Sequence, residues 1–112
     1  MKLVEGVTED VTVLEAYGRI DSTTAKEFGQ RLLSLLQSGR SSVMVDLQNI
    51  VYISSAGFRA LLIANRAAAE KQGRLALCGV IGEVKRLFEI GAFIDEFVIY
   101  PTQAEGIDKL RQ

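Results

Sequence analysis

The sequence predicts an α/β domain built on a mixed, largely parallel sheet of four to five strands with about four helices. Three observations favour this class. Strand-like and helix-like patterns alternate after residue 10. The central strand candidates are apolar at consecutive positions, which is typical of strands buried on both faces. The length of 112 residues is close to the commonest domain size, so residues 1–112 are expected to form one domain.

The first half of the chain predicts two strands, a helix and a third strand. Residues 2–6 can form a short strand, and residues 11–17 alternate in polarity up to a turn at residues 18–21. Residues 23–38 are expected to form a helix, because apolar side chains recur at i, i+4, i+7 and i+8. That stripe consists of Phe28, Leu32, Leu35 and Leu36. Residues 43–47 are apolar and predict a buried strand.

The second half continues the alternation. A helix is expected over residues 55–71, a short apolar strand over 74–79 and a helix over 81–90. Residues 97–99 predict a last strand and residues 102–111 a terminal helix. Helices of this number could cover one face of the sheet or both, and periodicity alone does not decide between these arrangements.

Between the third strand and the second long helix, residues 50–59 read Ile-Val-Tyr-Ile-Ser-Ser-Ala-Gly-Phe-Arg. We interpret this stretch as a loop that delivers Ser54 and Ser55 to the first turn of the helix. The unpaired N–H groups and the positive end of the dipole at a helix N-terminus favour an anion. Ser55 can therefore be an N-cap, a site where a phosphate is added and removed, or both.

Composition argues against several classes of function. Thirteen basic and fourteen acidic residues give a net charge of −1, without the basic excess of a nucleic-acid-binding protein. The absence of histidine removes the Ser-His and Cys-His nucleophile pairs. No Cys/His cluster offers a zinc site, and no Gly-rich phosphate loop offers a nucleotide site. We therefore expect a protein that is not an enzyme and carries no metal or cofactor.

Cysteine usage and hydropathy indicate the compartment. Cys78 is the only cysteine, lies in an apolar run and is expected to be a buried thiol. The first residues lack the long apolar segment of a signal peptide, and no run approaches the length of a membrane span. These features predict a cytoplasmic protein that has no membrane partner.

Four segments, taken together in this order and spacing, resemble the STAS domain family, specifically bacterial anti-sigma factor antagonists. They are the Gly-Arg-Ile-Asp-Ser-Thr-Thr-Ala turn at 18–25, the strand at 43–47, the Tyr-Ile-Ser-Ser-Ala-Gly segment at 52–57 and the strand at 73–79. The resemblance covers nearly the whole chain. It implies the STAS fold and a role as a binding module that is switched by phosphorylation.

The resemblance also implies partners and a modification site. Members of this family bind an anti-sigma factor that is a GHKL-type serine kinase, and this binding releases the sigma factor. The kinase phosphorylates a loop serine and breaks the complex, and a PPM-type phosphatase restores it. The usual loop reads Asp-Ser-(Ser/Thr)-Gly. Aligned on Gly57, this chain has Ser54 at the aspartate position and Ser55 at the acceptor position, with Ser54 as the alternative acceptor.

A partner-binding surface is expected around that loop. If the strands that precede the two helices are adjacent and parallel, their carboxyl ends bring Asp21 and Ser22 next to Ser54 and Ser55. Asp21 can equally be an N-cap of the first helix, for which Ser22 and Thr23 are further candidates. The remaining candidates of the surface are Tyr52, Phe58 and Arg59. Tyrosine and arginine are enriched in binding hot spots, whereas Phe58 can also be explained as part of the core.

Two other functions are compatible with the sequence. The chain could be a structural STAS subunit of a larger assembly, either transporter-associated or stressosome-like, in which the serine would be only a helix cap. It could also carry a small molecule or lipid, although no residue pattern marks a pocket for one. An obligate large complex of the purified protein would favour the first of these alternatives.

Overall fold

The computed structural model describes residues 1–111, in which helices pack on a five-stranded sheet. Strand β1 (Lys2–Thr8) pairs antiparallel with β2 (Val11–Ile20). Strands β3 (Ser42–Ile53), β4 (Arg74–Cys78) and β5 (Val98–Tyr100) then follow in parallel, in the spatial order β1-β2-β3-β4-β5. The predicted mixed, largely parallel sheet is confirmed.

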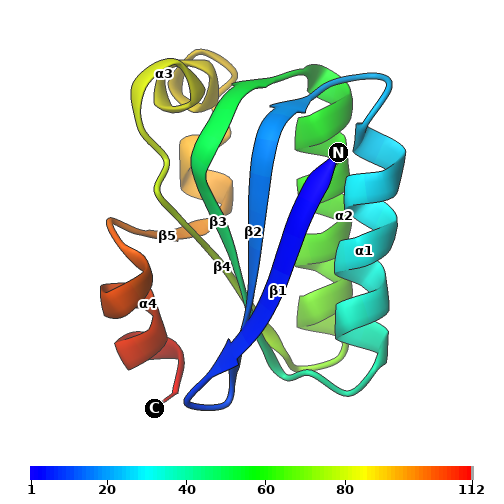
Figure 1. Ribbon diagram of the computed structural model, residues 1–112, viewed down its shortest axis with the longest axis vertical. Coiled ribbons are helices and arrows are strands. Elements are labelled where there is room, and N and C mark those ends of the chain that lie inside the picture. The colour runs from blue at the N-terminus through cyan, green and yellow to red at the C-terminus, as the bar shows by residue number, and fades with distance from the viewer. Residues whose placement is uncertain (112) are drawn as a thin grey trace.

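Helices cover both faces of the sheet (Figure 1). The helices α1 (Ala25–Gln37), α2 (Ser55–Glu70) and α3 (Gly82–Ile90) contribute side chains to one core cluster. Helix α4 (Gln103–Leu110) lies on the opposite face and contributes to a separate cluster. A single 3-10 turn, η1 (Ile94–Glu96), precedes β5 and was not expected from the sequence. The structure thus shows that the helices cover both faces of the sheet, a point that periodicity alone did not decide.

The two core clusters explain why the central strands are apolar at consecutive positions. In β3, Val43 and Val45 point into the cluster beneath α1 and α2, and Met44 points into the cluster beneath α4. All three side chains are fully buried, because both faces of the strand are covered. The predicted apolar stripe of α1 is also confirmed as part of the larger cluster: Phe28, Leu32, Leu35 and Leu36.

Strands β2 and β3 are longer than predicted, and the predicted turn at 18–21 and the loop at 50–53 are wrong. Arg19 pairs with Tyr52, and Ile20 pairs with Ile53, so both strands stay extended up to the serines. The register shifts twice along this pair, between Glu15 and Tyr17 and between Gly18 and Arg19 on the β2 side. Irregularities of this kind break the period-2 pattern that a sequence would show.

The remaining boundaries differ from the predictions by a few residues. Helix α1 begins at Ala25 instead of residue 23, because residues 21–24 form a separate hydrogen-bonded turn. Strand β5 occupies 98–100 instead of 97–99, and α4 begins after its N-cap Thr102. No helix in the described part of the chain is long and apolar enough to cross a lipid bilayer.

Candidate functional site

The carboxyl ends of β2 and β3 place two segments side by side at one rim of the sheet. The strands end in register, with Ile20 opposite Ile53, and the Ser54 N–H donates a hydrogen bond of 2.8 Å to the Ile20 carbonyl. Asp21 follows directly in one segment and Ser55 in the other. The predicted proximity of the turn before α1 and the two serines is therefore confirmed.

Ser54 is the N-cap of α2. Its backbone is extended, and its hydroxyl accepts a hydrogen bond of 3.4 Å from the Gly57 N–H. Its carbonyl accepts from the Phe58 N–H at 3.0 Å, which is the first bond of the helix. The predicted cap at Ser55 is thus wrong by one residue, because β3 continues to Ile53 and the helix begins immediately after Ser54.

Ser55 is the first residue of α2, and its surroundings differ from those of Ser54. Its side chain is exposed and makes no hydrogen bond within the described residues. The first N–H groups of a helix have no partner within the helix, and only that of Gly57 is capped here. A negatively charged group on the Ser55 hydroxyl would therefore lie at the positive end of α2 and meet no competing internal bond.

Asp21 shapes the turn that precedes α1. Its Oδ1 accepts bonds from the Thr23 N–H at 3.0 Å and from the Thr23 hydroxyl at 2.7 Å. These bonds, with smaller contributions from Thr24, hold the pKa of the Asp21 carboxyl below its usual value. The Asp21 carbonyl also accepts the N–H of Ala25, the first residue of the helix, at 2.8 Å. Asp21 thus supports the turn, while Ser22 beside it is exposed.

Gly57 allows α2 to pack closely against the strand ends. A Cβ at this position would lie 2.7 Å from the Ile53 side chain, 2.8 Å from the Ile20 side chain and 3.0 Å from the Ile20 carbonyl. Contacts below 3.0 Å do not occur between real side chains without a shift of the neighbouring atoms. Gly57 is therefore a point of close approach between α2 and the ends of β2 and β3.

Phe58 belongs to the core instead of the surface. Only 5% of the residue is exposed. Its ring stacks on Phe93 with centroids 4.3 Å apart and meets Phe88 edge-on at 4.7 Å. A partner at the rim cannot reach this ring, so Phe58 is removed from the candidate surface.

Tyr52 points away from the two serines. Ile53 is buried beneath the helices, and neighbouring residues in a strand face opposite sides, so Tyr52 lies on the other face of the sheet. The Arg19 guanidinium lies over its ring at 4.4 Å, and the Arg19 Nε is 3.7 Å from Asp21 Oδ2. Arg19 therefore links Tyr52 to the rim, a contact that the sequence analysis did not identify.

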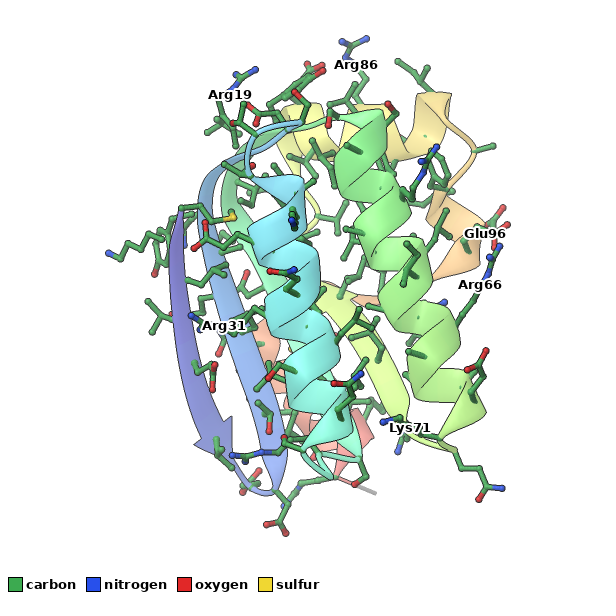
Figure 2. The ribbon with its side chains drawn as sticks, turned by 90° about the vertical axis from the view of Figure 1, so that its right-hand side faces the viewer. Arg19, Arg31, Arg66, Lys71, Arg86 and Glu96 are labelled. Atoms are coloured by element: carbon green, nitrogen blue, oxygen red, sulfur yellow. The ribbon has the colours of Figure 1, made fainter. Side chains whose placement is uncertain are left out.

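Arg59 lies one helical turn beyond Ser55, on the outer face of α2. Both residues line a hollow of about 490 Å³, which we call the Ser55 hollow. The other lining residues are Leu62, Ile63, Arg66 and Phe93. Figure 2 looks onto α1 and α2, which run side by side over the sheet, and shows Arg66 projecting from the outer side of α2. The predicted residues Ser55 and Arg59 thus share one surface.

Polar groups also gather on the opposite face of the sheet, next to α4. The Gln103 Nε2 donates to Glu15 Oε2 and to Asp46 Oδ2, each at 2.7 Å, and Asp46 is only 6% exposed. Cys78 is fully buried beside them, as predicted, and burial raises the pKa of its thiol to about 12. Over the described residues, no group of three or more acidic, cysteine or histidine side chains could hold a metal ion. We interpret this cluster as a structural contact that holds α4 on the sheet.

Comparison with known proteins identifies the family. Residues 4–106 match the family model of the STAS domain. This chain belongs to the STAS domain family. BtrV of Bordetella bronchiseptica, which bears the provisional name of an anti-sigma factor antagonist, is 30% identical over 99 residues, or 88% of this chain and 85% of BtrV. The anti-sigma-B factor antagonist of Staphylococcus aureus is 28% identical over 93 residues, or 82% of this STAS domain and 86% of that protein.

Solved structures share the fold of this STAS domain. A Thermotoga maritima protein, provisionally described as an anti-sigma factor antagonist, superposes with a TM-score of 0.90 at 18% identity, over 98% of this chain and 95% of that one. The Bacillus cell fate determinant SpoIIAA in its phosphorylated form superposes with a TM-score of 0.72 at 16% identity, over 96% and 98%. At these identities the similarity concerns the fold, which is the STAS fold.

Several residues of the site were missed by the sequence analysis. Arg66 and Ile63 follow Arg59 at i+7 and i+4, so helical spacing from Arg59 would have placed them on the same face of α2. Phe93 lines the hollow from the segment after α3, and no local pattern indicates that contact. Helical spacing thus finds neighbours within one element, whereas contacts between elements require the fold.

Proposed function

We propose that this STAS domain is an anti-sigma factor antagonist whose partner is an anti-sigma factor that also acts as a GHKL-type serine kinase. Binding of the antagonist to this partner releases the sigma factor. Phosphorylation of Ser55 ends the binding, and a PPM-type serine phosphatase restores it. The names of the relatives in Bordetella and Staphylococcus support the first part of the proposal.

The observation that carries the proposal is the contrast between the two serines. The Ser54 hydroxyl is used as a helix cap, whereas the Ser55 hydroxyl is exposed and unbonded at the first position of α2. A kinase can therefore reach Ser55 without breaking a bond of the fold. Ser54, the alternative acceptor, would lose its cap on modification. The phosphorylated form of SpoIIAA shows that another protein of this fold carries the modification.

Ser54 also explains how the chain departs from the Asp-Ser motif of the family. Aspartate and serine are both favoured N-caps, because each places an oxygen near the free N–H groups of the first turn. Ser54 therefore retains the structural role of the aspartate but lacks its negative charge. We expect the cap to be preserved, and Ser55 to be presented to the kinase in the same position.

Phosphorylation of Ser55 should leave the fold intact and change the surface. A phosphoserine carries about −1.5 to −2 charges at neutral pH. At a helix N-terminus a negative charge is stabilising by about 0.3–1 kcal/mol, so α2 does not unfold. The charge lies at the edge of the surface proposed to contact the partner, where it alters binding directly.

The test uses the purified protein, ATP and the purified anti-sigma factor kinase encoded by the same genome. We expect one phosphate, located at Ser55 by mass spectrometry. The Ser55→Ala variant should not be labelled but should still bind the kinase, because the Ser55 side chain makes no hydrogen bond within the described residues. Ser55→Asp should fold and bind about a hundredfold more weakly, a loss of about 2.7 kcal/mol. Isothermal titration calorimetry measures both affinities.

Ser54→Ala provides the matched control. It should still be labelled at Ser55 and should lose about 1 kcal/mol of stability through the missing cap. Labelling that vanishes in Ser54→Ala and persists in Ser55→Ala would shift the acceptor by one residue, to Ser54. Unchanged binding by Ser55→Asp would refute the switch. A protein that elutes in size-exclusion chromatography only as a large assembly would favour the structural-subunit alternative.

A further inference from the structure

The outer face of α2 carries a second hollow next to the Ser55 hollow. It measures about 230 Å³ and lies between α1 and α2, so we call it the α1–α2 hollow. Arg59 and Ile63, one helical turn apart, line both hollows and form the ridge between them. Ile63 is 45% exposed, which is high for an isoleucine. The floor is shallow because α1 and α2 approach closely, with a Cβ on Gly29 lying 3.3 Å from the Ala60 Cβ.

The walls of the two hollows are mostly apolar or cationic, and Ser55 and Gln30 are their neutral polar residues. Leu33, Ala60 and Ile63 line the α1–α2 hollow, and Leu62 and Phe93 line the Ser55 hollow. No aspartate or glutamate lines either of them within the described chain. The charged residues that line them are Lys26, Arg59 and Arg66. We call the Ser55 hollow and the α1–α2 hollow together the double hollow. It is an apolar surface whose charged lining residues are all cations.

These three cations have no partner in the described structure. No ion pair or hydrogen bond is formed by the side chain of Lys26, Arg59 or Arg66. Arg66 and Glu96 both project toward the same edge in the view of Figure 2, but no ion pair joins the two. Several other arginines do form ion pairs, for example Arg31 with Glu5 at 3.0 Å and Arg111 with Asp108 at 3.1 Å. The three cations that line the two hollows are thus free of competing acidic groups of this domain.

We propose that this double hollow binds an acidic, amphipathic segment of the partner protein. Apolar side chains of that segment occupy the two hollows on either side of Ile63, and its carboxylates pair with Lys26, Arg59 and Arg66. Arginine favours this role because its planar guanidinium can hold a carboxylate with two parallel hydrogen bonds. The inference rests on the proposed function, since the segment is taken to belong to the anti-sigma factor.

This surface also provides a physical mechanism for the switch. Ser55 and Arg59 are four residues apart on one helix, a spacing that brings side chains together. A phosphate on Ser55 would pair with Arg59 and so compete with the carboxylates of the partner for the same cation. It would also repel the remaining acidic groups of the segment. The phosphate thus takes the place of the partner's carboxylates at Arg59, and the complex dissociates while α2 remains folded.

Charge reversal tests the inference in the complex. Arg59→Glu and Arg66→Glu should each weaken binding to the purified anti-sigma factor kinase at least tenfold, and higher salt should weaken wild-type binding. Lys109→Glu, an exposed change of the same charge on α4, should bind as wild type does. If the kinase binds the wild type and both arginine variants equally well, the inference is overturned while the proposed function stands.

A synthetic peptide pair tests the surface without the kinase. One peptide is an amphipathic helix of leucine and glutamate, and the other carries lysine in place of every glutamate. In a ¹H–¹⁵N NMR titration, the acidic peptide should shift the amide signals of Arg59, Ile63 and Leu33, and the basic peptide should not. The acidic peptide should lose this effect with Arg59→Glu. No shift, or equal shifts with both peptides, would overturn the inference even if the kinase itself fails to bind.

Discussion

Ser54 and Ser55 are neighbours in the chain, yet only one of them is available for chemistry. Strand β3 ends at Ile53, immediately before the two serines. The N-cap position of α2 therefore falls on Ser54 and the first helical position on Ser55. A cap must turn its hydroxyl toward the helix, whereas the first helical residue turns its side chain outward. The difference between a structural and a modifiable serine here is therefore the position at which α2 begins.

Gly57 fixes that position, and its replacement should be costly. Gly57→Ala would place a methyl group 2.7 Å from Ile53 and 3.0 Å from the Ile20 carbonyl. Overpacking of this kind costs about 1–3 kcal/mol, and α2 would have to move away from the strand ends. Urea denaturation measures the loss. Gly6→Ala is the control, because a Cβ there meets nothing within 4 Å. Equal stability of the two variants would contradict the proposed close contact.

At the scale of elements, the turn before α1 is held by one carboxylate. Asp21 accepts two bonds from Thr23 and provides the carbonyl for the first N–H of the helix. The turn lies against α2, because Ile20 and Ser54 are joined by a backbone hydrogen bond. The Asp21 side chain therefore supports the geometry of the turn at this rim.

Asp21→Asn should remove part of the acid dependence of stability. The hydrogen bonds from Thr23 lower the pKa of Asp21 in the folded state below its unfolded value of about 3.9. The stability that ionised Asp21 contributes is thus present above about pH 4 and is lost as pH falls through the lower folded value. The difference in melting temperature between wild type and Asp21→Asn should be largest near pH 7 and shrink toward pH 3.

Thermal unfolding followed by circular dichroism between pH 3 and pH 7 measures this difference. Glu70→Gln removes one negative charge from an exposed position at the far end of α2 and controls for net charge. A difference for Asp21→Asn that stays constant or grows on acidification would show that the turn does not depend on the ionised carboxylate.

Elements could be predicted from the sequence wherever one pattern extends over several residues. The stripe of α1 and the apolar run of β3 each repeat over several positions, so the two elements were found. The extended segments that end at Ile20 and Ile53 were missed, because two register shifts interrupt the alternation and Gly18 has a positive φ of 98° within the strand. The N-cap position depends on where β3 ends, so the candidate cap at Ser55 was one residue too late. Phe58, for which surface and core were both open, lies in the core because of contacts with Phe88 and Phe93 that are distant in the sequence.

At the scale of the whole molecule, the two faces of the sheet have separate tasks. The face beneath α1 and α2 supports Ser55 and the double hollow. The opposite face is covered by α4. Its first residue, Gln103, donates hydrogen bonds to Glu15 and Asp46 and so holds this end of the helix on the sheet. The Leu110 carbonyl at its other end accepts a bond of 3.1 Å from Arg74. A partner bound on the α2 side should therefore leave α4 undisturbed.

Gln103→Ala should lower stability and leave partner binding intact. Two hydrogen bonds to carboxylates are lost, and Glu15 and Asp46 then face each other without the amide that bridges them. A bond to a charged group contributes about 1.5–3 kcal/mol, so we expect a loss of roughly 2–3 kcal/mol in urea denaturation. Hydrogen exchange should increase in α4 and stay unchanged in α2, since the two helices pack on opposite faces.

Gln103→Glu separates the electrostatic contribution of this contact from packing. It keeps the size of the side chain but adds a third carboxylate beside Glu15 and Asp46. Because like charges repel, the variant should be less stable than Gln103→Ala at pH 7. Gln37→Ala, at the exposed end of α1, should change stability by less than about 0.5 kcal/mol. A Gln103→Ala variant as stable as Gln37→Ala would show that the hydrogen bonds of Gln103 do not hold α4 on the sheet. Reduced affinity of Gln103→Ala for the anti-sigma factor would instead place the partner on both faces of the sheet.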